Sequence, residues 1–266
     1  MSLENTLNMP YVDFMAYIKE TNRAPWWEKM LLELAKTTFL NDKKKILHVA
    51  CNTWSSLREI SLLTQCHWIG IDINENMIKV ANELKNNEKL VSELLDYKVM
   101  DWQNLEFEDE TFDASFTTWW MAFIPDKQKW IQELSRVTKE WWFVADFIMY
   151  YKETPPDYLI EEMNNLMGIN IQKWNKQFWI DMYTNEWLSL FHEYEGSYAE
   201  VSQEKLLNYC RIMSRNRDDI SESERLLIEY KLYWIMSLFT ENHKHLGACL
   251  LVFRKETKNN QISLFS

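Results

Sequence analysis

Residues 45–56 have the sequence KILHVACNTWSS, a short apolar run that passes into residues suited to a turn and a helix start. The sequence HWIGI follows at residues 67–71 and leads directly into Asp72. A strand, a turn into a helix, and a second strand that ends in an acid form the layout of a nucleotide-binding βαβ unit. This stretch therefore predicts neighbouring parallel strands over 46–51 and 67–72, joined by a helix over 55–64.

The turn of this unit contains no glycine. Glycine is normally used there because a positive φ costs it little and because its missing Cβ lets a ligand approach the backbone. The 266 residues include only four glycines, whereas average usage would supply about 18. Ala50, Asn52 and Trp54 stand at the places where this turn usually has glycine.

The composition is that of a soluble globular protein, with 47% apolar and 26% charged residues. No run of apolar residues is long enough for a membrane span, and the N-terminus lacks the pattern of a signal peptide. The net charge of −11 argues against nucleic acid as a partner, because phosphates require clustered lysine and arginine. We expect a cytoplasmic protein of one large domain, or of one domain with a sizeable insertion.

The cysteine and histidine residues give no metal or disulfide pattern. The four cysteines are scattered and flanked by apolar residues, which predicts buried free thiols. These are Cys51, Cys66, Cys210 and Cys249. His192, His243 and His245 are not spaced with acids or cysteines as metal ligands would be, so no metal site is expected.

The remaining pattern alternates strands with helices up to residue 147. Further strands are predicted over 97–100, 112–117 and 141–147, and Asn74 is a candidate N-cap for a helix over 75–86. Such alternation predicts an α/β protein with a mostly parallel sheet covered on both faces. The other predicted elements are N-terminal helices over 9–20 and 26–39, a helix over 127–138, helices over 157–167, 171–191, 202–214 and 222–240, a strand-like segment over 194–201 and a final strand over 247–253.

Taken in order, these segments resemble the class I S-adenosylmethionine-dependent methyltransferases, in particular the subclass that acts on small molecules. Residues 46–56 stand where that family has its glycine-rich first motif, and GIDIN at 70–74 is similar to its second-strand motif. MDW at 100–102 resembles the segment that contacts adenine. LSRVTK at 134–139 resembles the run into the fifth strand. YVDF at 11–14, followed by NRAP at 22–25, is similar to a helix and loop that cap the cofactor.

The resemblance implies a Rossmann-like class I methyltransferase fold with a mostly parallel seven-stranded sheet and a helical cap. Residues 1–40 would form an N-terminal helical lid and residues 41–153 the cofactor-binding core. Residues 154–245 would form a helical substrate or cap region, and residues 246–254 the final strand of the core sheet.

The same resemblance implies S-adenosylmethionine or S-adenosylhomocysteine as the cofactor. Asp72 would hold the ribose hydroxyls, while Asp101 would accept from the adenine amino group with Trp102 stacking nearby. Ile73, Ala50, Asn52, Thr117 and His48 complete the cofactor-binding candidates. Alternative interpretations remain open: Asp72 as a helix-capping acid, Asp101 as a solvated loop acid, and His48 as a strand-end histidine bonded to the backbone or as a general base.

The candidates for the substrate pocket are aromatic residues and one arginine. They are Tyr11, Tyr17, Arg23, Trp54, Trp119 and Trp120. The three tryptophans could hold a sulfonium by cation–π attraction, or they could fill the pocket. Tyr11 and Tyr17 lie on the predicted lid helix, where packing into the core is the alternative.

This chain departs from the family where the methionine end of the cofactor would lie. His48 stands where the family has an acid, and an indole at Trp54 would narrow or fill the methionine end of the pocket. The acids Asp72 and Asp101, which face the nucleoside end, are present. Three functions follow: a methyltransferase acting on a small molecule, a silent methyltransferase-fold subunit that partners an active paralogue, and non-methylating sulfonium chemistry. The tryptophan pairs 26–27 and 141–142 predict an interface, so we expect a homodimer or a heterodimer with a methyltransferase paralogue.

Overall fold

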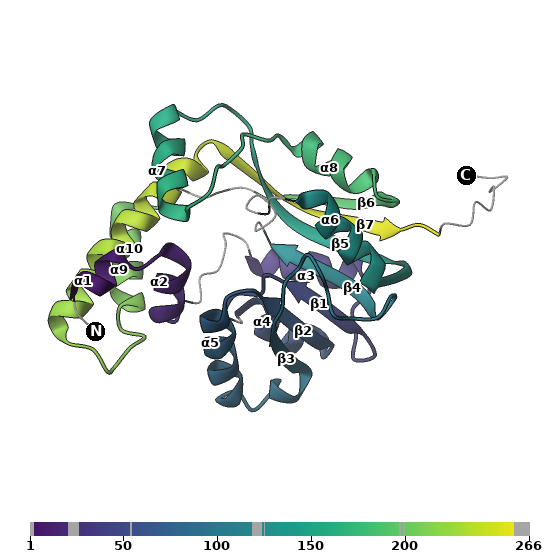
Figure 1. The fold of residues 1–266 in the computed structure, drawn as a ribbon, viewed down its shortest axis with the longest axis horizontal. Helices are drawn as coiled ribbons and strands as arrows, with labels where there is room; N and C mark the ends of the chain where they lie inside the picture. The colour runs from purple at the N-terminus through teal and green to yellow at the C-terminus, as the bar shows by residue number, and fades with distance from the viewer. Residues whose placement is uncertain are drawn as a thin grey trace.

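The computed structural model describes residues 3–20, 27–53, 55–118, 124, 126–196, 198 and 200–257. Within these residues, one seven-stranded sheet has the order β3-β2-β1-β4-β5-β7-β6 (Figure 1). Its strands are β1 (Lys45–Val49), β2 (His67–Asp72), β3 (Leu95–Val99), β4 (Phe112–Thr118), β5 (Thr138–Tyr151), β6 (Leu188–Gly196) and β7 (Leu246–Lys255). The first five are parallel, and β7 runs antiparallel to both β5 and β6. The predicted Rossmann-like, mostly parallel sheet is confirmed.

The βαβ unit forms as the sequence predicts. β1 and β2 are adjacent and parallel, with Leu47 level with Ile69 and His48 level with Gly70. Gly70 is needed for packing, because a Cβ at this position would lie 2.7 Å from Leu57 Cδ1 of the connecting helix. The connecting helix α4 spans Ser55–Thr64, the predicted range.

Helices cover both faces of the sheet. One face is packed by α3 (Trp27–Thr37), α4 and α5 (Glu75–Asn86), which bury residues such as Leu34, Ile60 and Ile78 against the strands. The other face is packed by α6 (Lys127–Val137) and α8 (Lys176–Thr184), which bury Ile131 and Trp179. A short 3-10 helix, η1 (Ser92–Leu94), precedes β3.

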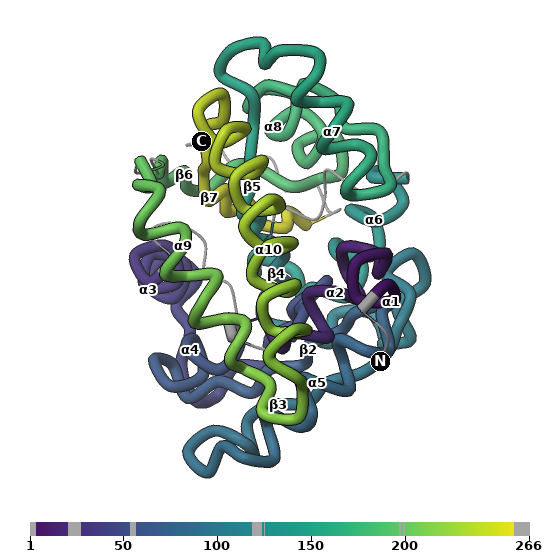
Figure 2. The backbone as a smooth tube through the Cα atoms, turned by 90° about the vertical axis from the view of Figure 1, so that its left-hand side faces the viewer, coloured from purple at the N-terminus to yellow at the C-terminus, as the bar shows by residue number. Residues whose placement is uncertain are grey.

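A second group of helices lies beyond the carboxyl ends of the parallel strands. It consists of α1 (Leu3–Asn8), α2 (Tyr11–Tyr17), α7 (Asp157–Met167), α9 (Gln203–Met213) and α10 (Glu222–His243). In Figure 2, α9 and α10 run side by side and the N-terminal helices lie against α10. Phe14, Ile228 and Leu232 share one apolar cluster with Met77 of α5, so this helical cap packs onto the core.

The N-terminal helices are held to the cap by two buried charged residues of α10. The ammonium of Lys231 donates to the carbonyl oxygens of Thr6, Leu7 and Met9 at 3.1, 2.8 and 2.7 Å. These carbonyls lie at the end of α1, where helix carbonyls lack internal donors and carry partial negative charge. Glu224 accepts the hydroxyls of Thr6 and Tyr17 at 3.1 and 2.6 Å. The lid and the last helix therefore form one unit.

Two predicted elements are wrong. The helix predicted over 171–191 ends at Thr184, and residues 188–196 form β6, which pairs with β7. The mostly apolar run from 187 to 191 fits the spacing of a helix as well as that of a strand. Its pairing partner β7 lies more than 50 residues further along the sequence. The helix predicted over 9–20 is also shorter, because α2 begins after Pro10 and a separate helix, α1, precedes it. Hence α8 and β6, within the range predicted as cap, lie with the sheet.

All four cysteines are buried and free, as predicted. No helix in the described part of the chain is long and apolar enough to cross a membrane.

Candidate functional site

The candidate site lies along the edge formed by the carboxyl ends of β1, β2, β3 and β4. In an open parallel sheet, ligands bind outside this edge. The residues predicted to bind the cofactor lie at or just beyond the ends of β1, β2 and β3, at 50–53, 72–73 and 101–102. The fold thus brings together residues that are more than 50 positions apart in the sequence.

The loop after β1 keeps a glycine-like path although it has no glycine. Ala50 and Asn52 have φ values of 55° and 57°, in the left-handed region. Asparagine tolerates this conformation, whereas alanine pays about 1–2 kcal/mol for it. Two hydrogen bonds to the neighbouring strand hold the loop: Cys51 N–H donates to the Ile71 carbonyl at 2.9 Å, and Asn52 N–H donates to Asp72 Oδ2 at 3.0 Å.

Asp72 is half-buried at the end of β2 and faces two main-chain donors. Besides the Asn52 amide, the Asn74 N–H donates to its Oδ1 at 2.9 Å. Burial raises the pKa of this carboxyl, although the backbone hydrogen bonds act in the opposite direction. Asn74 caps α5 by accepting from the amides of Asn76 and Met77, as predicted. Asp72 therefore orders the start of α5 from outside the helix, and each of its oxygens has a lone pair left for a ligand.

The side chains that follow β2 and β3 are open to solvent. Ile73 and Asp101 are exposed, and Trp102 is half-buried against the α6 face of the core. Asp101 Oδ1 accepts the N–H of Gln103 at 2.8 Å, which turns the chain away from the strand. Ile73 and Asp101 thus remain accessible to a ligand at this edge of the sheet.

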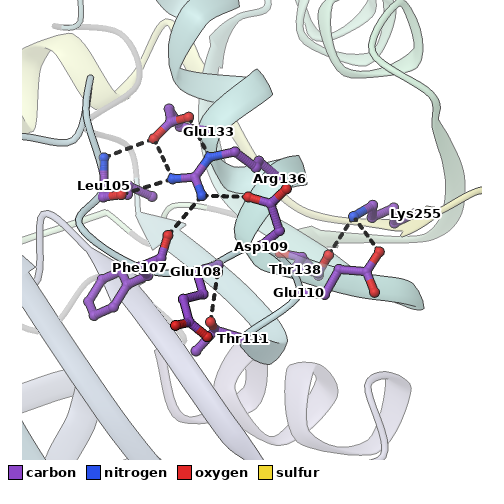
Figure 3. Close-up of polar contacts among 10 residues, drawn as sticks. All are labelled: Leu105, Phe107, Glu108, Asp109, Glu110, Thr111, Glu133, Arg136, Thr138 and Lys255. Atoms are coloured by element: carbon purple, nitrogen blue, oxygen red, sulfur yellow. Dashed lines mark hydrogen bonds and ion pairs between the residues drawn. The ribbon is translucent and has the colours of Figure 1, made fainter.

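Arg136 of α6 fixes the segment that follows Asp101 (Figure 3). Its guanidinium donates to the carbonyls of Leu105 and Phe107, each at 2.8 Å, and to the carboxylates of Asp109 and Glu133. Glu133 in turn accepts the Leu105 N–H at 2.8 Å. These bonds tie the loop before β4 to the helix after it.

His48 and Thr117 lie inside the sheet, just below the site edge. His48 is buried and stacks on Phe116 at 4.9 Å between ring centroids. Neither of its ring nitrogens has a hydrogen-bond partner among the described residues, so the backbone-bonded interpretation is wrong. Burial lowers the pKa of His48 to about 3, which keeps the imidazole neutral. The Thr117 hydroxyl is also buried and donates to the Val49 carbonyl at 3.4 Å.

The structure adds a buried acid that was not predicted. Asp146 of β5 is level with Thr117 and is completely buried. Its Oδ2 accepts the Tyr183 hydroxyl at 2.8 Å, and its Oδ1 has no partner in the described part of the chain. Burial raises the pKa of this carboxyl to about 7. The signal in the sequence was a single acid within the apolar run WWFVADFIM.

The lid contacts the site from the other side. The Thr53 hydroxyl donates to the Glu20 carbonyl at 2.6 Å, and Asn74 Nδ2 donates to Asp13 Oδ1 at 3.0 Å. The predicted substrate residues of this lid have other partners, because Tyr17 bonds to Glu224 and Tyr11 packs edge-on against Phe239. Arg23, Trp54, Trp119 and Trp120 lie outside the described residues.

One group of side chains in the described chain has ligand atoms close enough for a metal ion. Glu193, Glu195 and Cys249 lie within 4.8 Å of one another at the antiparallel end of the sheet. The Lys176 ammonium pairs with both carboxylates, so a cation already lies at this cluster and offsets one of its two negative charges.

Comparison with known proteins shows which family the chain resembles. The family described as "Methyltransferase domain" matches residues 47–141, which run from β1 into β5 and include the candidate site. The solved structure of the MccD protein has a TM-score of 0.71 and 26% identity, and the match covers 88% of this chain and all of that one. Over residues 47–141 and in its overall fold, the chain is similar to the class I methyltransferases. The predicted resemblance is thereby confirmed.

Two curated relatives match part of this chain. A demethylmenaquinone methyltransferase of Desulfitobacterium hafniense is 30% identical over 42% of this chain, and the match covers 45% of that protein. An uncharacterized protein of Haemophilus influenzae is 24% identical over 63% of this chain and 67% of its own length. The chain therefore spans between about half and two thirds of these relatives.

Two further solved structures share the fold alone. Phosphoethanolamine N-methyltransferase 2 of Haemonchus contortus, in complex with S-adenosyl-L-methionine, has a TM-score of 0.70 at 15% identity, covering 97% of this chain and 60% of that one. The [4+2]-cyclase SpnF has a TM-score of 0.66 at 14% identity, covering 90% and 86%. One fold thus serves more than one chemistry.

Proposed function

We propose that this chain is an S-adenosylmethionine-dependent methyltransferase that acts on a small molecule. The observation that carries the proposal is the loop after β1, which keeps left-handed conformations at Ala50 and Asn52 and bonds to Asp72 without any glycine. This is the loop conformation that lets a ligand approach the backbone in a nucleotide-binding βαβ unit. The cofactor of the phosphoethanolamine N-methyltransferase supports the same ligand here.

The described residues fit the nucleoside part of this cofactor. Asp72 would accept hydrogen bonds from the ribose hydroxyls, because both of its oxygens are oriented by main-chain amides and retain acceptor capacity. Ile73 would pack on the adenine ring, and Asp101 would accept from its amino group. Each of these side chains follows a strand at the site edge.

The bound cofactor supplies a methyl group on a positively charged sulfur. The residues of this chain act by holding the acceptor in line with that group, and such positioning provides most of the rate enhancement in reactions of this type. The lid contributes by bonding to both sides of the site, through Thr53 and Asn74. A neutral His48 below the loop leaves this position without the negative charge that the family has there.

The second proposal is a silent subunit that associates with an active methyltransferase paralogue or with itself. It is supported by the neutral His48 and by exposed tryptophans such as Trp141 and Trp187. A third proposal is non-methylating sulfonium chemistry, which the shared fold of a [4+2]-cyclase supports at the level of fold only.

Calorimetric titration with S-adenosylmethionine and with S-adenosylhomocysteine tests these proposals. Saturable binding of both, weakened in Asp72→Ala, supports the enzyme. No binding at any accessible concentration contradicts it and favours the silent subunit. Consumption of S-adenosylmethionine by the loaded protein without methylated product would favour the third proposal.

A further inference from the structure

Three bulky aromatic residues have positive φ values and are exposed. Phe39, Trp141 and Trp187 have φ values of 54°, 65° and 61°, and their exposed fractions are 61%, 54% and 58%. Phe39 follows α3 shortly before β1, Trp141 lies near the start of β5, and Trp187 immediately precedes β6. Phe39 and Trp141 therefore lie at the edge of the sheet opposite the candidate site.

These residues adjoin one another through a chain of ring and cation contacts. Phe143 lies 6.1 Å from Phe39 and 5.1 Å from Phe191 between ring centroids. The Arg254 guanidinium lies 5.3 Å from the Trp141 ring and 5.9 Å from the Phe191 ring. On the neighbouring strand, the Trp187 carbonyl accepts the N–H of Glu256, two residues after Arg254. We call Phe39, Trp141, Trp187, Leu190, Phe191 and Arg254 the aromatic edge.

The backbone conformation of these residues has local causes, whereas their exposure to water does not. Phe39 ends α3 in the left-handed conformation, and the Leu40 N–H donates to the Ala35 carbonyl at 3.0 Å. Trp141 lies at the irregular register between β4 and β5, a bulge position where glycine normally supplies the positive φ. Large aromatic side chains that gather on an exposed surface commonly mark a contact with another chain.

The exposed aromatic area is about half of what one partner contributes to a standard dimer interface. An aromatic side chain covers about 150–250 Å², so four of them at roughly half exposure offer about 300–500 Å². Leu190 adds to this, with 38% of its surface exposed. A standard interface takes about 800 Å² from each partner. The aromatic edge therefore supplies about half of that area, and the adjoining strand can supply much of the rest.

That adjoining strand is β6, the last strand of the sheet. Figure 2 shows it at the outer border beyond β7, so within the described chain its outer edge has no strand partner. Unpaired edges of this kind accept another strand readily. The part of β6 next to the aromatic edge, residues 188–191, carries no charge, whereas Glu193 and Glu195 follow on the same strand.

The charges on β6 select how a second copy would pair. Antiparallel pairing centred on Leu190 places Ser189 opposite Phe191 of the other copy and brings no carboxylates face to face. Pairing centred on Tyr194 would set Glu193 opposite Glu195, and like charges directly opposite each other are destabilising. Charge therefore favours the arrangement that also buries Trp187 and Phe191.

We infer that the aromatic edge binds a second copy of this chain, with β6 pairing antiparallel to β6 of that copy about Leu190. Such a two-fold contact is self-complementary and closes on itself. The inference rests on the proposed association of this chain with a paralogue or with itself, and it selects the homodimer. It does not depend on whether the chain transfers methyl groups. The cofactor edge stays open in each copy, because the aromatic edge lies at the other end of the parallel strands.

Sedimentation velocity of the full chain over a range of concentrations tests the inference. We expect a dimer, and we expect Phe191→Glu to raise its dissociation constant by at least about tenfold, as loss of an interface anchor does. Trp187→Ser, which adds no charge, should weaken it in the same direction. The matched control is Tyr230→Glu on α10, a 70% exposed aromatic outside the aromatic edge, which should leave the dimer unchanged.

Several results would overturn this inference. One is a monomer at every concentration. A second is a dimer that Phe191→Glu and Trp187→Ser leave intact, which would place the interface elsewhere. A third is association only with an added methyltransferase paralogue. Circular dichroism checks that both variants fold, and cofactor titration of the monomeric variants reports separately on the proposed function.

Discussion

The main-chain N–H of Asn52 donates a hydrogen bond to Asp72 Oδ2 at 3.0 Å. This bond joins the loop after β1 to the acid after β2, so the orientation of the carboxylate depends on the left-handed conformation of the loop. Because the Asn74 amide holds the other oxygen, Asp72 is oriented before any ligand arrives.

Replacing Asp72 with alanine should weaken the binding of S-adenosylhomocysteine by about tenfold or more. One or two ribose hydroxyls would lose a charged acceptor, and each such hydrogen bond is worth about 1.5–3 kcal/mol. Calorimetry measures the change. Asp96→Ala is the control, because Asp96 is an exposed acid on β3 that pairs with Lys85. Equal affinity in Asp72→Ala and in the unchanged protein would exclude Asp72 as the ribose ligand.

Replacing Ala50 with glycine should stabilise the protein by about 0.5–1 kcal/mol. Glycine removes the left-handed strain of about 1–2 kcal/mol and costs about 0.4–1 kcal/mol through the freer unfolded chain. Urea unfolding measures this free energy. Ala50→Val is the matched comparison and should lower this free energy, since a β-branched residue tolerates φ near 55° least well. A loss of stability in Ala50→Gly would show that the alanine methyl makes a needed contact.

His48 should make the fold sensitive to acid. Its pKa is about 3 in the folded chain, against about 6.5 in an unfolded one. Between these values the unfolded chain binds a proton and the folded chain does not. The stability that neutral His48 permits is therefore full above pH 6.5 and is lost as the pH falls toward 3. In His48→Phe, unfolding free energies measured across this window should fall less steeply.

Asp146 should change the stability of the fold with pH in the opposite direction to His48, lowering it as the pH rises. Burial raises its pKa to about 7, whereas an unfolded aspartate titrates near 3.9. The folded chain holds the extra proton in this window, so the contribution of Asp146 is full below about pH 4 and is lost as the pH rises through 7. At pH 8, the free energy of unfolding of Asp146→Asn should exceed that of the unchanged protein by at least about 1 kcal/mol.

Tyr183 provides the control for this prediction. Its hydroxyl donates to the Asp146 carboxylate and favours the charged form. Tyr183→Phe should therefore raise the pKa of Asp146 further and move the loss of stability to higher pH. Identical pH profiles for Tyr183→Phe and the unchanged protein would mean that this hydrogen bond does not tune the carboxyl.

Local patterns in the sequence were enough to predict the βαβ unit, because its strands, its connecting helix and the Asn74 cap are each specified within a few residues. β6 could not be predicted in the same way, since it is a strand only through its pairing with β7, far along the chain.

In the candidate site, too, some features follow from the local sequence and others only from contacts made in the folded chain. The positions of Asp72 and Asp101 after their strands follow from the motifs. The positive φ at Ala50 does not, because alanine by itself favours negative φ. Asp146 has a raised pKa only because the folded chain buries it, and its hydrogen-bond partner Tyr183 lies 37 residues away in the sequence. The roles of all these residues in binding remain predictions.

The bond from Lys231 to the end of α1 has a consequence for how the protein is made. Thr6 and Lys231 are 225 positions apart, and translation adds about 5–20 residues per second. The N-terminal helices thus wait roughly ten seconds or longer on the ribosome before the lysine that completes them exists. During that time their apolar side chains are without α10, so α1 and α2 are among the last helices to complete their packing.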